Sequence, residues 1–226
     1  MNNLRQVKMG ALYVDGVAQE IPFLPEFDHI PRYSQTNSSI IIANHQPSRP
    51  ESLITWNVVD GMERWSKNGV LLIADRVLLV NVTRENLAAN RFLRNGTVIS
   101  LKGKSYLCRL PYIGFNENDT INEWDDVLNR TTDDNDIWHW ETVGTIGQET
   151  SSLTRGFSEP HGWYKRVFLM GALQNGFRPV LEPLDVLSKD PEHVPYPEFE
   201  AAYADLGIPY EEIKETYRQL EGAAKG

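Results

Sequence analysis

The sequence predicts an α+β fold with short antiparallel sheets, a few helices and much irregular chain, extended at its end by a pair of helices. Two observations predict the sheets: Asp15-Gly16 and Lys102-Gly103 each separate two runs that carry apolar residues, which is the pattern of a β-hairpin. A third predicts the helical end, because the composition changes near Asp185 from aromatic to charged. With 226 residues, the chain can bury a core without disulfides or metal.

Residues 1–50 are expected to form a hairpin followed by a turn-rich region. The hairpin joins residues 8–14 to residues 17–21, and five prolines follow from Pro22 to Pro50. Within the turn-rich region, three consecutive isoleucines predict one strand over residues 38–43.

Residues 51–184 are expected to form the main domain, which opens with strands. Residues 53–59 predict the first strand. The continuous apolar run from Val70 to Ala74 is typical of a strand that is covered on both faces. The next apolar run, residues 77–80, predicts either a strand or a short helical turn. The second hairpin joins residues 97–101 to residues 104–110.

Two short helices are expected inside this domain. Thr83 can cap the first, which runs from residue 84 to residue 90. Asp119 or Thr120 is expected to cap the second, an amphipathic helix over residues 121–128. Its apolar side chains recur at helical spacing along one side: Ile121, Trp124, Val127 and Leu128.

Two tryptophans follow an acidic stretch near residue 135. Trp138 and Trp140 are two residues apart, so on a strand they would share one face, and we expect that face to lie in the core. His139 would then point the other way.

The C-terminal segment, residues 185–226, is expected to be a linker and a helical appendage. Three prolines stiffen the linker, and residues 198–206 and 210–220 predict the two helices. A short helical pair cannot bury its own apolar face. We therefore expect it to pack on the domain or to contact a partner, including a second copy of the chain.

Charge and cysteine content exclude several classes of protein. The net charge of −9 disfavours nucleic acid, whose binders usually carry a basic stripe. A single cysteine, Cys108, excludes an internal disulfide and a Cys-rich zinc site. The sequence shows neither the apolar region of a signal peptide nor an apolar run near the ~20 residues that span a membrane. We expect cytoplasmic synthesis, followed either by residence there or by release in a virion.

Several segments in one order carry a resemblance to a known fold. They are residues 54–59 with 71–76, residues 122–128, residues 136–140 with Gln148-Glu149, and residues 154–158 followed by Trp163 and residues 175–182. Together they span about residues 50–184 and resemble the C-type-lectin-like domains of bacterial and phage proteins. That group includes the formylglycine-generating-enzyme-like fold and the variable proteins diversified by retroelements. Because this fold carries unrelated functions, the resemblance does not identify an activity.

The resemblance implies that the end of the domain runs out along one face and returns to the core. Gly176 would permit close packing, Phe177 would fill the core, and Arg178 would tie loops together through its fork of donors. The span from Phe157 to Gln174 would then be presented outward.

This outward span and its edge supply the candidate ligand-binding residues. Aromatic and arginine side chains on a fixed scaffold are typical of binding hot spots. The alternative is that Trp163 and Phe168 are core residues and that Tyr164 and Arg166 are merely solvated. The candidates are Arg155, Glu159, His161, Trp163, Tyr164, Arg166 and Phe168.

No catalytic residue, cofactor or metal is assigned from the sequence. The formylglycine-generating enzymes would imply a cysteine pair near the chain's end, but no cysteine follows Cys108, and a buried free cysteine usually acts as a small hydrophobe. The five histidines fall in no zinc-binding spacing. The acidic residues 133–136 lack the EF-hand spacing, so a solvated loop is favoured over a calcium site.

We therefore expect a non-catalytic binding protein, derived from a phage or prophage, that presents an aromatic and arginine surface to a protein or glycan ligand. It would be either a virion component for host recognition or an intracellular inhibitor of a host protein. The competing hypothesis is a hydrolase or transferase that uses acidic residues with His139 or His161. It requires these groups to converge in one pocket.

Overall fold

The computed structural model describes residues 4–22, 29–33, 38–45, 53–93, 95–141, 143–149, 153–165 and 175–184. All of these belong to one unit, Met1–Val186. The helical pair expected at residues 198–206 and 210–220 lies outside the described residues, as do residues 23–28, 34–37 and 46–50 of the turn-rich region expected from Pro22 to Pro50.

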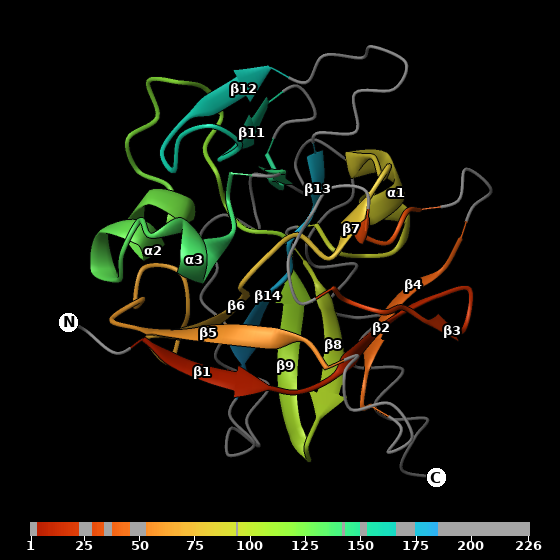
Figure 1. The fold of residues 1–226 in the computed structure, drawn as a ribbon. Helices are drawn as coiled ribbons and strands as arrows, with labels where there is room; N and C mark the ends of the chain where they lie inside the picture. The colour runs from red at the N-terminus through yellow and green to blue at the C-terminus, as the bar shows by residue number, and fades with distance from the viewer. Residues whose placement is uncertain are drawn as a thin grey trace, which may run out of the picture. The chain divides into compact units, whose positions relative to one another are not determined.

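The largest sheet has six strands and is antiparallel throughout (Figure 1). It begins with a strand from the expected N-terminal region, so the sheet crosses residue 50. In spatial order its strands are β1 (Arg5–Lys8), β5 (Thr55–Asp60), β6 (Val70–Ala74), β14 (Val180–Pro183), β9 (Lys104–Arg109) and β8 (Thr97–Leu101).

Two smaller sheets complete the strands of the described chain. The five-stranded sheet contains one parallel pair, β10 with β13, and is otherwise antiparallel. Its order is β12 (Trp163–Lys165), β11 (Leu153–Arg155), β10 (Gly144–Ile146), β13 (Asn175–Phe177) and β7 (Leu79–Val80). The three-stranded sheet has the order β3 (Val17–Ala18), β2 (Ala11–Val14) and β4 (Ile40–Ala43). The described chain is thus mostly antiparallel sheet, as predicted.

Both expected hairpins are confirmed, and the backbone angles of their turns explain why the strands pair there. Asp15 and Gly16 have φ of 52° and 77°, and Lys102 and Gly103 have φ of 50° and 75°. Two consecutive positive φ angles make the tight turn whose twist matches that of paired strands. The turns join β2 to β3 and β8 to β9.

The continuous apolar run of β6 is confirmed as a strand covered on both faces. Leu72 and Ala74 belong to one buried hydrophobic cluster, whereas Leu71 and Ile73 belong to another. The second cluster includes the helical side chains Trp124, Val127, Leu128 and Trp138. The six-stranded sheet therefore has a core on each side, and the helices α2 (Glu123–Arg130) and α3 (Asn135–Trp138) close one of them.

The closing segment behaves as the sequence predicts. A Cβ on Gly176 would lie 2.3 Å from Val77 Cγ1 and 2.5 Å from the Leu79 carbonyl oxygen, so only glycine fits. Phe177 is fully buried against Phe92. Arg178, also fully buried, donates to the carbonyl oxygens of Asp75, Trp138 and His139.

Helix α1 (Arg84–Ala89) confirms its expected cap, whereas the predicted start of α2 is wrong. Thr83 Oγ1 accepts from Asn86 N at 3.1 Å. Helix α2 (Glu123–Arg130) begins two residues later than predicted, because Asn122 is its N-cap and accepts from Asp125 N at 2.8 Å. Ile121 consequently lies before the helix and is 55% exposed, so it does not line the apolar side.

The strand expected around Trp138 is also wrong. Residues Asn135–Trp138 form the short helix α3, because the Asp134 carboxylate accepts from Asp136 N and caps it. His139 ends the helix in the left-handed conformation with φ of 43°. The predicted burial of Trp138 is confirmed, while Trp140 is only partly buried.

No helix among the described residues has both the length and the apolar character that crossing a membrane requires.

Candidate functional site

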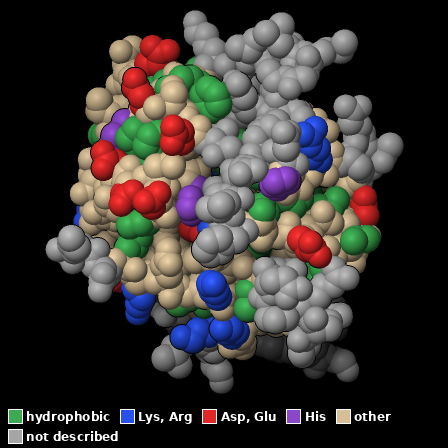
Figure 2. Space-filling view, viewed as in Figure 1, with side chains coloured by type: hydrophobic (Ala, Val, Ile, Leu, Met, Phe, Trp, Pro, Cys, Tyr) green, Lys and Arg blue, Asp and Glu red, His purple; other side chains and the backbone are tan. Residues whose placement is uncertain are grey.

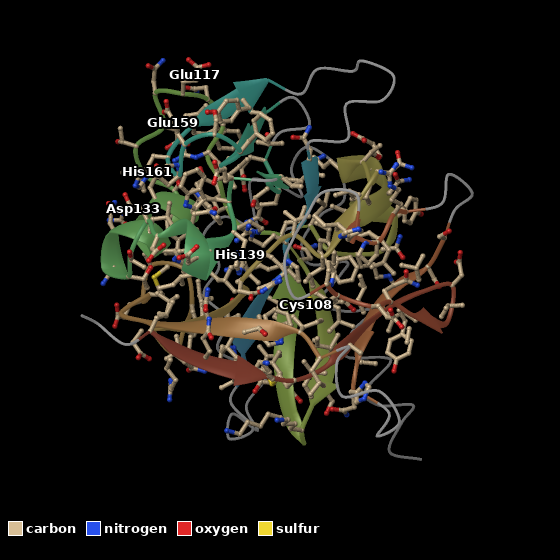
Figure 3. The ribbon with its side chains drawn as sticks, viewed as in Figure 1. Cys108, Glu117, Asp133, His139, Glu159 and His161 are labelled. Carbon is tan, nitrogen blue, oxygen red and sulfur yellow. The ribbon has the colours of Figure 1, made fainter. Side chains whose placement is uncertain are left out.

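Strands β11 and β12 and the loop between them carry the described candidate residues. Arg155 ends β11 and is the register partner of Trp163, which begins β12. The Arg155 guanidinium lies over the Trp163 ring, 4.3 Å from its centroid. Glu159 and His161 lie in the loop (Figure 3). Two further candidates, Arg166 and Phe168, fall outside the described residues.

A carboxylate from another element joins two of these candidates. Asp125, in the first turn of α2, accepts on Oδ1 from His161 Nδ1 at 2.7 Å and from Arg155 Nη2. Asn122 Nδ2 donates to Oδ2 at 2.7 Å. Burial acts to raise the pKa of Asp125, but the hydrogen bonds from Asn122 and His161 and the charge of Arg155 outweigh it and lower that pKa. Asp125 is therefore an ionised hub.

The sequence indicated Asp125 only as one of many carboxylates, and its role was missed. Asn122 and Asp125 are the N-cap and third residues of α2, and each hydrogen-bonds to the other. The Asp125 carboxylate accepts from the Asn122 side-chain amide, whereas a capping box uses the backbone N–H of the N-cap residue, so Asn122 was only a general signal of a helix start. Asp125 contacts Arg155 and His161, which lie 30 and 36 residues away in the sequence, and no local sequence pattern indicates such contacts.

The loop from Gly156 to Gly162 is held by hydrogen bonds to α2 and to the residues that follow α3. Trp124 Nε1, from α2, donates to the Pro160 carbonyl at 2.8 Å. The Phe157 N–H donates to the Trp140 carbonyl, beyond α3, at 2.7 Å. Gly162 N donates to the Glu159 carbonyl at 3.1 Å and closes a turn inside the loop. The exposed Glu159 and the His161 side chain, which is 44% exposed, are thus displayed on a fixed loop.

Tyr164 is positioned by the same loop. Its hydroxyl hydrogen-bonds to the Ser158 hydroxyl, and its ring packs edge-on against Phe157 with centroids 5.5 Å apart. Phe157 has a φ of 102°, which is unusual for a residue with a side chain. A strained conformation persists only where its surroundings fix it, and such residues cluster at functional sites.

Arg155 has more donors than partners. Its side chain is 1% exposed, and its Nε and Nη1 find no acceptor within the described part of the chain. Burial lowers the pKa of its guanidinium, and the charge of Asp125 opposes that effect. Buried donors are nearly always paired, so these two nitrogens are exceptions among the described residues, as is Nε of the core residue Arg178.

A second loop adjoins Trp163 and was not identified from the sequence. It runs from Leu110 to Asn122, and a Cβ on its Gly114 would lie 3.0 Å from Trp163 Cη2. Two large apolar side chains of this loop, Phe115 and Ile121, are 54% and 55% exposed. No sequence pattern indicated Phe115 as a contact residue, and Ile121 was predicted to lie in the helix over residues 121–128.

The two histidines of the alternative hypothesis contact different carboxylates. His139 Nε2 lies 3.1 Å from Arg76 Nη2 and 3.9 Å from Asp75 Oδ2, whereas His161 pairs with Asp125 (Figure 3). Burial and the nearby Arg76 lower the pKa of His139. The described residues therefore give each histidine a separate ionic environment.

Cys108 lies mid-strand in β9 and is fully buried, as expected of a small hydrophobe. Burial raises the pKa of its thiol far above the ordinary value, so the reactive thiolate is suppressed.

Comparison of the chain with models of known families, with curated proteins and with solved structures gave no match.

Proposed function

We propose that the chain is a non-catalytic binding protein with a C-type-lectin-like core and a phage or prophage origin. It holds a protein or glycan ligand on the face formed by residues 157–164, and the buried Arg155 supports this face from beneath. It serves either as a virion component in host recognition or as an intracellular inhibitor of a host protein. The observation that carries the proposal is the ionic hub, in which Asp125 fixes Arg155 and His161 beneath an exposed loop.

Preorganisation is the physical basis of the proposal. A binding loop that must be ordered on contact loses affinity to that ordering, whereas a loop already fixed does not. Two hydrogen bonds fix the loop from Gly156 to Gly162. Trp124 of α2 donates to the Pro160 carbonyl, and the Phe157 N–H donates to the carbonyl of Trp140, which follows α3. The loop displays the Glu159 carboxylate and the His161 imidazole, and Tyr164 of β12 lies beside it through its bond to Ser158. These groups suit the directional contacts of a specific surface.

The lectin-like core is supported by the path of the last described strands. Residues 175–177 pair at the five-stranded sheet, and β14 then enters the six-stranded sheet between β6 and β9. The end of the domain thus returns from the candidate face to the core.

The alternative, a hydrolase or transferase, has less support. Its favourable feature is the 2.7 Å contact between His161 and Asp125, since a carboxylate commonly orients a catalytic imidazole. However, the same Asp125 oxygen also holds Arg155, and the nearby Ser158 hydroxyl hydrogen-bonds to Tyr164 instead of to the imidazole.

A ligand search with paired variants tests the proposal. The purified chain is probed with a random peptide library displayed on phage and with a glycan array. We expect at least one of them to give a ligand, and His161→Ala combined with Tyr164→Ala to weaken its binding by roughly tenfold or more. Tyr13→Ala combined with His45→Ala changes the same residue types at the three-stranded sheet and is the matched control. Equal binding by the two double variants would contradict the proposed face.

A further inference from the structure

Phe115 and Ile121 expose large apolar side chains on one loop. They are 54% and 55% exposed, although solvation of such surface is unfavourable. Single exposed apolar residues are ordinary, but two on one loop beside a partly exposed tryptophan are typical of a contact surface. We name Phe115, Ile121 and Trp163 the anchor surface.

One carboxylate fixes the loop that carries this surface. Asp119 Oδ2 accepts from Phe115 N at 3.2 Å and from the Tyr112 hydroxyl at 3.3 Å, and its Oδ1 accepts from Ile121 N at 3.3 Å. The Tyr112 ring stacks on Trp65 and also meets the Phe115 ring edge-on. The two apolar side chains are therefore displayed by a built loop, which lowers the entropy that a partner would have to remove.

The anchor surface is continuous with the face of the proposed function. Gly114, which precedes Phe115, packs against Trp163, and the helix that follows Ile121 contributes both Asp125 and the Trp124 contact to Pro160. A partner that covers one of the two loops therefore lies beside the other.

The charge around the anchor surface determines what could cover it. Residues 115–141 hold nine Asp and Glu against the single Arg130, which gives this segment −8 of the chain's net charge of −9. Glu117 of the loop that carries the anchor surface and Glu159 of the neighbouring loop are exposed, and Figure 3 places both near β12, with the exposed Asp133 on the same side of the molecule. Figure 2 shows Asp and Glu side chains gathered on the part of this face where Figure 1 has α2 and α3.

We propose that the anchor surface docks a positively charged segment of a partner protein that brings apolar side chains with it. The inference rests on the proposed binding function and specifies its ligand. A concentration of one charge on one face steers an oppositely charged partner and repels nucleic acid and anionic lipid. A neutral glycan carries no cationic group that could pair with these carboxylates, whereas a protein segment can carry lysine and arginine. We therefore favour a protein segment as the ligand.

Three synthetic peptides test the inference directly. The first is rich in lysine and leucine, the second replaces its lysines with glutamate, and the third replaces its leucines with serine. Binding to the full chain is measured by fluorescence anisotropy at low and at high salt. We expect the lysine–leucine peptide to bind at least about tenfold more tightly than either counterpart, and its affinity to fall with added salt.

Two pairs of variants assign the binding to the surface. Phe115→Ser combined with Ile121→Ser should weaken binding about tenfold or more. Val17→Ser combined with Val98→Ser, which changes at least equally exposed apolar residues on β3 and β8, should leave it unchanged. Glu117→Gln combined with Glu159→Gln should remove much of the salt dependence. Glu20→Gln combined with Glu63→Gln is its control, with the same net charge on other exposed positions.

The outcomes separate this inference from the proposed function. Equal affinity for the lysine and glutamate peptides, equal affinity for the leucine and serine peptides, or no difference between the anchor variant and its control would each overturn the inference. A ligand whose binding depends on His161 and Tyr164 would still support the proposed function in all three cases. Loss of that dependence would instead contradict the proposed function.

Discussion

Two carboxylates in the first turn of α2 pair with arginines in different ways. Glu123 is fully buried and accepts from Arg109 Nη1 and Nη2 at 2.9 and 2.8 Å and from Tyr112 N at 2.7 Å. Asp125, two residues later, has a side chain that is 21% exposed and holds Arg155 and His161. Residues two apart on a helix point to nearly opposite sides, so one short turn serves both the sheet and the candidate face.

The two arginines differ in how completely the described residues pair their donors. Arg109 fills its fork with the two Glu123 oxygens and the carbonyls of Leu110 and Trp65. Arg155 leaves two donors without an acceptor in the described chain and shares its carboxylate with a partly exposed histidine. Among the described residues, the donors of Arg109 at the sheet are thus paired, whereas two donors of Arg155 below the candidate face are not.

Breaking the pair of Arg109 with Glu123 should have the largest effect on stability. Glu123→Ala leaves Arg109 buried without its carboxylate, and the Tyr112 N–H loses its acceptor. We expect the free energy of unfolding to fall by about 3–5 kcal/mol, measured by chemical denaturation. The exposed Glu117→Ala in the preceding loop should change it by less than about 0.5 kcal/mol. Similar losses in the two variants would contradict the contrast.

Breaking the pair of Arg155 with Asp125 should lower the free energy of unfolding by a smaller amount. Arg155→Ala removes one donor from Asp125, which keeps those of Asn122 and His161. The expected loss in the free energy of unfolding is about 1–3 kcal/mol, because one partner of a buried polar group is removed. Arg130→Ala, at an exposed position of the same helix, is the control. A loss as large as that of Glu123→Ala would mean that Arg155 is scaffold.

The smallest effect should appear in the pH dependence of stability. The pKa of Asp125 is lower in the folded chain than its ordinary value of 3.8, so the carboxylate stabilises the fold above that value. This contribution is lost as the pH falls through the folded pKa. The difference in free energy of unfolding between wild type and Asp125→Asn should be constant above about pH 5 and shrink below about pH 4. A pH-independent difference would show that the charge of Asp125 is not what stabilises the hub.

Local chemistry made parts of this fold predictable. The Asp15-Gly16 and Lys102-Gly103 turns and the Thr83 cap each depend on side chains and backbone angles within a few residues, and all three were predicted. The start of α2 was misplaced because three polar residues compete there. Asn122 takes the cap, while Asp119 uses its carboxylate to bind the loop before the helix.

The site was only partly predictable. The candidates in β11, β12 and their loop followed from the aromatic and charged composition and from the resemblance, and the ligand-binding role of all seven stays a prediction. The role of Asp125 was missed because its pairing with Arg155 and His161 is long-range. The anchor residues Phe115 and Ile121 were missed because a local sequence pattern does not predict which apolar side chains stay exposed.

The sequence by itself therefore determined the hairpins, the first helix cap and the buried β6 run, since these follow from turn chemistry, local capping and a continuous apolar run. Only the tertiary structure decided which carboxylate of α2 pairs with the sheet and which pairs with Arg155 and His161 at the candidate face. That choice depends on Arg109 and Arg155 arriving from strands 14 and 30 residues away. Charge pairing across such separations is fixed by the packing of the sheets and not by the residues beside each carboxylate.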